Sequence, residues 1–380
     1  MKTTALAWRP CAAAVLACTG AAFAQSQPAP AAPQPQAWQT CAALTDNNAR
    51  LACFDTWARS QTPPAAAAAQ ATPTVDAKAP EPHAIPARAA GAENGCHDRR
   101  YSALSRFWEL EKGTDCGTFN LRGYRPIIAS LVTANSVNKQ PSSPAPGHTA
   151  PTAQPYRDQE TRIQLSARVK VMKDIFTAGD KELSDSLWVG YTQQSYWQFF
   201  NPSLSRPFRS TDYEPELMYV RPTRIEIGDM KLRFATLGIT HQSNGQTLPL
   251  SRSWNRLSLG AAAEWNDRFS LAGRVWTRLH ETHNDDNPDI TDHVGRAEIA
   301  GTWRPDPANT WVATWRTPLR GNGNGSVRLE YFRALGKGAL QGNLNDLRLY
   351  AQVFHGYGDS MIDYNRRRTV IGLGLALVDW

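Results

Sequence analysis

Hydrophobic and polar residues alternate along roughly the last two thirds of the chain, with the two-residue period of β-strands. The segments 162–171, 295–304 and 347–353 place mostly Leu, Ile, Val, Ala, Gly or Trp on one face and mostly charged or polar residues on the other. Turn sequences such as Asn266-Asp267 and Gly321-Asn322-Gly323 separate the runs. The pattern predicts about twelve antiparallel strands.

The alternation favours a membrane barrel, in which apolar side chains face outward and polar ones face the lumen. The segment nearest to the roughly 18 consecutive apolar residues of a spanning helix is 370–378, which Gly372 and Gly374 interrupt. We therefore expect an all-β fold, a twelve-stranded antiparallel transmembrane β-barrel. A soluble antiparallel sandwich is the alternative, disfavoured by the small apolar positions and the frequent Trp and Tyr.

The N-terminus has the features of an export signal over residues 1–24. Basic residues precede a short apolar run at 11–17, and Ala22-Phe23-Ala24 forms a small-x-small cleavage site. Lipidation at Cys18 is an alternative. Either route exports the protein.

Residues 25–95 are rich in Pro, Ala and Gln, a composition that favours flexible linkers. Within them, residues 38–59 carry apolar side chains at roughly helical spacing, which predicts a small helical hairpin. A lead-in segment, 96–121, then precedes the barrel domain, 122–380. The role of the extension is open; a spacer, a periplasmic partner site and a plug all fit.

Four of the six cysteines lie beyond the leader, in two close pairs: Cys41 with Cys53 and Cys96 with Cys116. In an exported chain this spacing suggests two local disulfides, with free thiols as the alternative. The CxxC and Cys/His spacings of zinc sites are absent from the sequence.

The formal net charge of +7 comes from Lys and Arg residues interleaved with apolar positions rather than clustered in one patch. We interpret these charges as lumen-facing or loop charges and expect no nucleic-acid partner.

Three polar residues occupy the apolar face of two neighbouring strands. His241 and Ser243 continue the parity of Leu237 and Ile239, and Asn255 shares the parity of Leu257 in the strand that follows. A serine needs an adjacent base to become a nucleophile, and a histidine needs an acceptor on its second nitrogen to fix its orientation. The pattern thus indicates a Ser-His-Asn catalytic site that faces lipid.

These residues lie in Thr-His-Gln-Ser-Asn-Gly (240–245) and Ser-Arg-Ser-Trp-Asn-Arg (251–256), which resemble the signature of the outer membrane phospholipase A family. The resemblance extends through further segments in matching order: 159–165, 191–195, 207–215, 287–290, 295–298 and 356–360. It implies a twelve-stranded outer-membrane barrel that hydrolyses the sn-1 and sn-2 acyl esters of phospholipids, requires Ca²⁺ and is activated by homodimerisation.

The resemblance also implies roles for individual residues. Ser243 would be the nucleophile, His241 the general base and Asn255 the orienting group, while the Gly245 backbone N–H would stabilise the oxyanion.

Calcium would bind the Ser251 hydroxyl, the Gln246 carbonyl and the Ser205 carbonyl of the second subunit. Gln246 stands where the family leads us to expect arginine, a change that a backbone ligand tolerates.

Gln193 shares the parity of outward-facing Val189 and Tyr191, so its amide should seek a partner. In a symmetric dimer it could bond to its own copy; the alternative is a glutamine at the level of the lipid headgroups. The acidic and histidine-rich stretch 280–293 could hold a metal, but it lacks the ligand spacing of an EF-hand and is interpreted as a solvated loop. The remaining functional alternative is a non-catalytic barrel, porin-like or structural.

Overall fold

The computed structural model describes residues 37–60, 95–266, 268–279, 285–321, 323–336 and 347–378. Its contacts divide the chain into two compact units, residues 1–84 and 85–380. The predicted signal peptide, the alternative lipidation site at Cys18, most of the Pro/Ala-rich extension and residues 280–284 lie outside the described residues.

The first unit contains a helical hairpin. Its helices are α1 (Ala37–Ala42) and α2 (Asn47–Ser60), and a disulfide joins Cys41 to Cys53. Asp46 caps α2, because its carboxylate accepts a hydrogen bond of 2.8 Å from the Ala49 backbone N–H.

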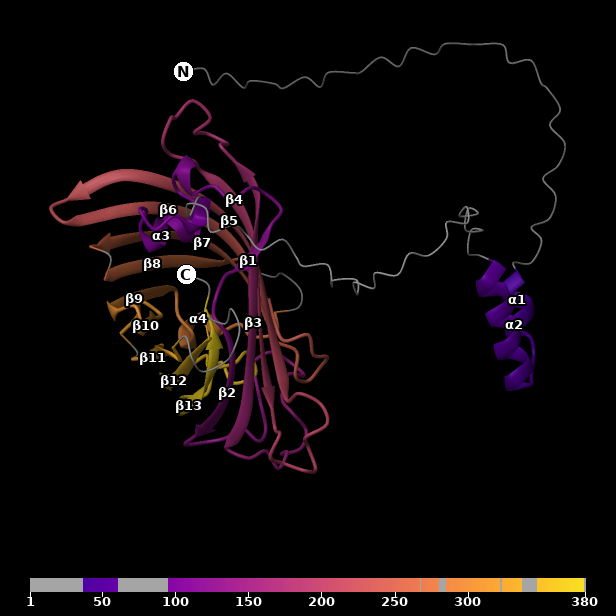
Figure 1. Ribbon diagram of the computed structural model, residues 1–380. Coiled ribbons are helices and arrows are strands. Elements are labelled where there is room, and N and C mark those ends of the chain that lie inside the picture. The colour runs from indigo at the N-terminus through magenta and orange to yellow at the C-terminus, as the bar shows by residue number, and fades with distance from the viewer. Residues whose placement is uncertain are drawn as a thin grey trace, which may run out of the picture. The chain divides into compact units, whose positions relative to one another are not determined.

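The second unit is a β-barrel (Figure 1). Its long strands are β2 (Ile127–Ala134), β3 (Gln159–Lys173), β4 (Ser186–Trp197), β5 (Ser210–Ile227), β6 (Met230–Ser243), β7 (Ser253–Trp265), β8 (Phe269–Leu279), β9 (Ala297–Asp306), β10 (Asn309–Thr317), β11 (Ser326–Ala334), β12 (Leu347–Gly356) and β13 (Arg368–Leu377).

Each long strand pairs with its neighbours in antiparallel fashion, and the pairing of β13 with β2 closes the sheet. A thirteenth, short strand, β1 (Leu121–Gly123), extends the β2 edge of β3 by pairing with residues 167–169. The closed twelve-stranded barrel confirms the predicted fold, and the sandwich alternative is wrong.

The predicted alternation appears as two chemically distinct faces. Outward side chains are apolar and exposed, as at Leu165, Leu237 and Leu259. Inward side chains are polar and buried, as at Arg168 and Glu216. A lipid bilayer is the environment in which such an apolar outer band is stable. In the described residues, no helix has the length and hydropathy to cross a membrane.

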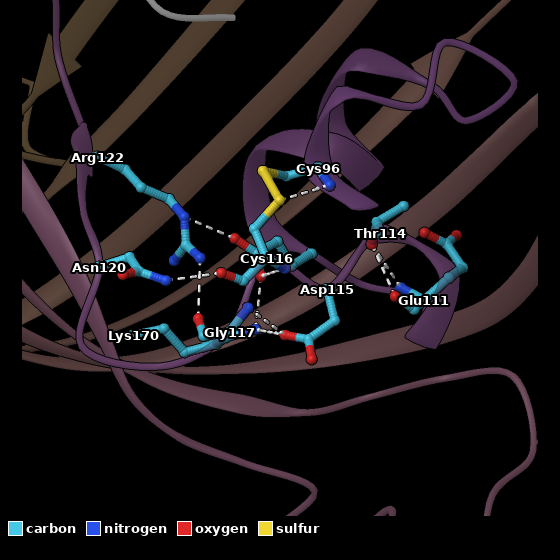
Figure 2. Close-up of a disulfide and its surroundings, with 10 residues drawn as sticks. Cys96, Glu111, Thr114, Asp115, Cys116, Gly117, Asn120, Arg122 and Lys170 are labelled. Carbon is cyan, nitrogen blue, oxygen red and sulfur yellow. Dashed lines mark hydrogen bonds and ion pairs between the residues drawn. A yellow bond between two sulfur atoms is a disulfide. The ribbon is translucent and has the colours of Figure 1, made fainter. Parts of the chain in front are cut away.

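The lead-in segment fills part of the lumen. It contains η1 (Gly95–His97), α3 (Ala103–Trp108) and η2 (Lys112–Thr114), and a disulfide joins Cys96 to Cys116 (Figure 2). Trp108 at the end of α3 packs against inward-facing Trp188 and Phe234.

Buried ion pairs hold the same segment to the wall. Lys170 Nζ on β3 lies 2.5 Å from both Glu109 Oε2 and Asp115 Oδ1, and Arg122 Nε lies 2.9 Å from Glu109 Oε1. In Figure 2, Arg122 also reaches the carbonyl of Gly117. These opposite charges satisfy one another where water is excluded.

Connections alternate between the two ends of the barrel, as an antiparallel meander requires. The hairpin turns 228–229 and 307–308 lie at one end. The opposite end carries the connections 135–158, 198–209, 244–252, 280–296, 318–325 and 357–367. A short helix, α4 (Ile290–His293), lies in one of them. The predicted catalytic residues flank the connection 244–252 and so belong to this end.

Candidate active site at the β6–β7 hairpin

Strand register brings the predicted catalytic residues together on the outer face. His241 on β6 directly opposes Asn255 on β7, and Ser243 opposes Ser253. His241 is exposed, and Ser243 and Asn255 are half-buried, on the face that also presents exposed Ile239 and Leu257. These three polar side chains thus lie on an otherwise apolar surface, as the alternation of side chains along the strands predicts.

A hydrogen bond links His241 to Asn255. The His241 Nδ1 atom lies 2.8 Å from the Asn255 Oδ1 atom. Because an amide oxygen only accepts, Nδ1 carries the proton, and Nε2 keeps a lone pair with which to act as a base.

Ser243 lies two residues beyond His241 on the same strand face. Its hydroxyl makes no hydrogen bond to any described residue, so the predicted contact with His241 is not formed as a hydrogen bond in this state. Catalytic hydrogen bonds often tighten only when substrate is bound.

The inner face of the hairpin is rigidly packed. Fully buried Trp254 donates from Nε1 to Gln242 Oε1 at 2.9 Å, and the Arg256 guanidinium lies 4.3 Å from the Trp254 ring centroid. Side chains locked in this way hold the outward residues between them in a fixed geometry.

Asn244 organises the loop 244–252, a role that the sequence analysis missed. Its side-chain oxygen accepts hydrogen bonds from the backbone N–H groups of Gln246 (3.3 Å) and Arg252 (3.0 Å), and its amide donates to the Leu250 carbonyl at 2.7 Å. Asn244 is only 2% exposed, so these bonds replace water inside the loop. In the sequence, Asn244 directly follows a predicted strand and precedes Gly245, a pattern typical of loop-forming residues that could have indicated this role.

Gly245 is required at its position for two reasons. Its backbone has φ +61°, a conformation that favours glycine, and a Cβ atom there would lie 2.9 Å from the Tyr213 ring. The backbone N–H assigned to the oxyanion therefore lies in a segment that only glycine fits without strain.

The predicted calcium ligand Ser251 lies beside a carboxylate. Its hydroxyl donates to Asp286 Oδ2 at 2.6 Å, and the Ser253 hydroxyl lies 3.3 Å from the same oxygen. Asp286 was assigned to a solvated loop; this interpretation is wrong for Asp286, which is built into the site. Two hydroxyls facing one carboxylate form the hard oxygen donor set that suits Ca²⁺.

The other two predicted calcium ligands are backbone groups. The Gln246 side chain is engaged elsewhere, since its amide donates to the Arg209 carbonyl at 3.0 Å. The Ser205 carbonyl accepts a hydrogen bond of 2.6 Å from Trp197 Nε1 within the same chain. A carbonyl has two lone pairs, so Ser205 keeps one for a second partner.

Residues beside Asp286 hold its segment in place. Asp289 accepts hydrogen bonds from Tyr364 Oη (2.5 Å) and His293 Nε2 (3.1 Å). Burial alone would raise the pKa of Asp289, but these two hydrogen bonds outweigh it and keep that pKa below its usual value. The resulting anion ties the β8–β9 connection to the β12–β13 connection.

A cluster of metal-binding residue types lies away from the candidate site. Within the described ranges, Cys96, His97 and Cys116 alone bring three such side chains close together. Both thiols are consumed by the disulfide, so the cluster offers His97 only.

Gln193 faces outward, as its parity predicts, but its amide has neighbours within the chain. Its Oε1 accepts from Tyr191 Oη at 3.0 Å, and its Nε2 lies 3.4 Å from Ser195 Oγ. An amide nitrogen has two hydrogens, so one remains for a group on another molecule.

Comparison with known proteins decides the family. A model of the family "Phospholipase A1" matches residues 104–377, which is most of the chain. The chain belongs to the phospholipase A1 family.

A putative phospholipase A1 from Neisseria meningitidis is 35% identical over 364 residues, which cover 89% of this chain and 90% of that protein. Phospholipase A1 of Escherichia coli K12 is 34% identical over 60% of this chain and 72% of its own length.

Solved structures agree with this membership. Outer membrane phospholipase A from Escherichia coli superposes with a TM-score of 0.58 at 30% identity, covering 68% of this chain and 94% of that one. The Salmonella typhi enzyme, solved as a dimer with bound calcium, gives 0.59 at 30% identity over 70% of this chain and 94% of its own.

Membership in the phospholipase A1 family has two consequences. The protein is a phospholipase, so the alternative of a non-catalytic barrel is wrong. The closed barrel and its likeness to outer membrane phospholipase A support a location in the outer membrane.

Proposed function

We propose that this phospholipase hydrolyses the sn-1 and sn-2 acyl esters of phospholipids with Ser243 as nucleophile, His241 as general base and Asn255 as orienting residue. The hydrogen bond between His241 and Asn255 carries the proposal, because it leaves Nε2 of a lipid-facing imidazole available as a base. Phospholipid from the outer leaflet would reach the site laterally, through the apolar outer face.

In the proposed reaction, the Ser243 hydroxyl attacks the ester carbonyl carbon while His241 Nε2 takes its proton. The oxyanion forms beside the Gly245 N–H, and the ester C–O bond then breaks as His241 returns the proton to the lysophospholipid oxygen. Water, deprotonated by His241, releases the fatty acid from the acyl-serine and restores the hydroxyl.

Calcium is proposed as the cofactor. The Ser251 hydroxyl, the Gln246 carbonyl and the partner subunit's Ser205 would hold it, and the structure adds the Asp286 carboxylate as a candidate ligand. When bound, Ca²⁺ would supply positive charge that stabilises the developing oxyanion. The calcium-bound dimer of the Salmonella typhi relative supports this assignment.

Homodimerisation is proposed as the activating step, since a carbonyl from the second subunit would complete the calcium site. Gln193 on the outer face of β4 is the proposed interface residue, hydrogen-bonding to its copy across the two-fold axis. A monomer would then rest inactive until membrane asymmetry is disturbed.

The proposed order along the chain is an export signal (1–24), a periplasmic extension (25–95), the disulfide-stapled lead-in (96–121) and the catalytic barrel (122–380). Export would place the barrel in the outer membrane and both cysteine pairs in an oxidising compartment.

Covalent labelling tests the nucleophile. A fluorophosphonate probe should modify the folded wild-type enzyme at Ser243, located by mass spectrometry of the digest, and should not modify Ser243→Ala. A phospholipid with different sn-1 and sn-2 chains then shows which fatty acids are released. Labelling at another serine, unchanged in Ser243→Ala, would remove Ser243 from the mechanism.

A further inference from the structure

The β2–β3 connection, residues 135–158, contacts the acidic group at the candidate calcium site. His148 in this connection is 8% exposed, and its Nε2 atom lies 2.9 Å from Asp286 Oδ1. Its Nδ1 atom lies 2.8 Å from the Pro146 carbonyl. Both partners are hydrogen-bond acceptors, so each of the two ring nitrogens faces an oxygen atom.

Three further contacts fix His148 and Asp286 relative to each other. The Ser143 hydroxyl donates to the Asp286 backbone carbonyl at 2.6 Å. The buried Arg252 guanidinium, next in sequence to Ser251, donates from Nη2 to the His148 carbonyl at 3.1 Å. The turn itself is closed by a hydrogen bond of 3.1 Å from the Ser143 N–H to the His148 carbonyl.

The two oxygens of Asp286 thus have separate partners. Oδ1 is held by His148, while Oδ2 faces the hydroxyls of Ser251 and Ser253. The terminal torsion of an aspartate is broad, so a carboxylate without an anchor on one oxygen samples many orientations. The hydrogen bond from His148 to Oδ1 restricts this torsion. Orienting Oδ2 toward the hydroxyls of Ser251 and Ser253 therefore costs less conformational entropy.

We propose that His148 is a positioning residue for the calcium site, which holds the Asp286 carboxylate toward Ser251 from the β2–β3 connection. The inference rests on the proposed calcium dependence of the enzyme. Groups that hydrogen-bond a ligating side chain typically change metal affinity by about 10- to 100-fold when they are removed. His148 would therefore act on the affinity for Ca²⁺ and not on the chemical step.

The test measures calcium binding and activity separately, on the mature full-length protein folded in detergent micelles. Isothermal titration calorimetry with CaCl₂ in the Ser243→Ala background gives the dissociation constant without turnover. Hydrolysis of mixed micelles as a function of calcium gives the half-activating concentration and the maximal rate. His148→Ala and His148→Gln are compared with His97→Ala, whose side chain is exposed near the other end of the barrel.

We expect His148→Ala to raise both the dissociation constant and the half-activating calcium concentration by about 10- to 100-fold, with the maximal rate within about twofold of wild type. For His148→Gln, which keeps one side-chain donor, both calcium values should lie between those of wild type and His148→Ala. For His97→Ala, both should equal those of wild type. Calcium affinity equal to wild type in a folded His148→Ala protein would overturn the inference, as would a lower maximal rate at unchanged affinity.

Two controls separate the possible failures. Heat-dependent electrophoretic mobility reports whether each barrel is folded. If His148→Ala does not fold, the single variants His148→Gln and Ser143→Ala are used instead; Ser143→Ala removes the hydrogen bond to the Asp286 carbonyl. A calcium affinity equal to wild type in both of these variants would then overturn the inference. Absence of calcium binding in the wild-type protein would instead overturn the proposed calcium dependence, and the role of His148 with it.

Discussion

His241 and Asn255 occupy directly opposed positions on β6 and β7, with 2.8 Å between Nδ1 and Oδ1. The usual partner of a catalytic histidine is a carboxylate, which carries a charge. On a face that must contact lipid, an ionised side chain is costly, whereas a neutral amide fixes the same tautomer without that cost. The Ser-His-Asn arrangement therefore fits the outer surface of a barrel.

Replacing Asn255 with Ala should lower kcat about fivefold, because His241 loses a hydrogen bond worth about 1 kcal/mol that fixes its tautomer. Asn255→Asp keeps an acceptor and should retain more activity than Asn255→Ala. Steady-state hydrolysis in micelles measures both, with Asn309→Ala at the opposite end of the barrel as control. Wild-type kcat in Asn255→Ala would contradict the orienting role.

Gly245→Ala should lower kcat by about 100-fold or more, since loss of one oxyanion donor typically costs 10²- to 10³-fold. A new Cβ would meet the Tyr213 ring at 2.9 Å and displace the Gly245 N–H. Gly228→Ala is the matched control, because Gly228 has φ +58° but no described atom within 4 Å of its added Cβ. Equal activity in the two variants would show that the Gly245 geometry does not contribute to catalysis.

Gln193→Ala should weaken the calcium-loaded dimer by about 1 kcal/mol, the typical worth of an interhelical side-chain hydrogen bond within a membrane. Analytical ultracentrifugation in detergent with calcium measures the dissociation constant. Thr277→Ala, an exposed polar residue on β8, serves as control. If Gln193→Ala dimerises as wild type does, Gln193 lies outside the interface.

Removing the Cys96–Cys116 disulfide by a double Ser substitution should destabilise the lead-in segment by about 3 kcal/mol, the typical effect for a loop of this length. Hydrolysis at low temperature should persist, because the proposed catalytic residues lie at the other end of the barrel. The temperature at which the barrel loses its folded electrophoretic mobility measures the effect. Unchanged stability would mean that the buried ion pairs at Lys170 suffice to hold the segment.

The barrel and the outward orientation of the proposed catalytic residues were predictable from the sequence. Strand parity alone places Leu237, Ile239 and His241 on one face, because side-chain direction has a fixed period of two. That face is the outer one in the structure, and Asn255 lies on the same face of the paired strand.

The residues around the proposed calcium site were not predictable in this way. Asp286 is 31 residues beyond Asn255 and His148 is 93 residues before His241, so no local period relates them to the site. Their contacts arise because loops from three strand pairs converge at one end of the closed barrel, and loop conformation follows from side-chain hydrogen bonds that the sequence pattern does not encode. The packing of α3 inside the lumen was missed for the same reason.

The most direct test of the account is acyl-ester hydrolysis on mixed phospholipid–detergent micelles, comparing wild type with Ser243→Ala, each with calcium and with a chelator. We predict rapid hydrolysis only for the wild-type protein with calcium, and a rate at least about 1,000-fold lower in Ser243→Ala. Equal rates in wild type and Ser243→Ala would contradict the assignment of Ser243 as nucleophile, and equal wild-type rates with calcium and with chelator would contradict the proposed cofactor.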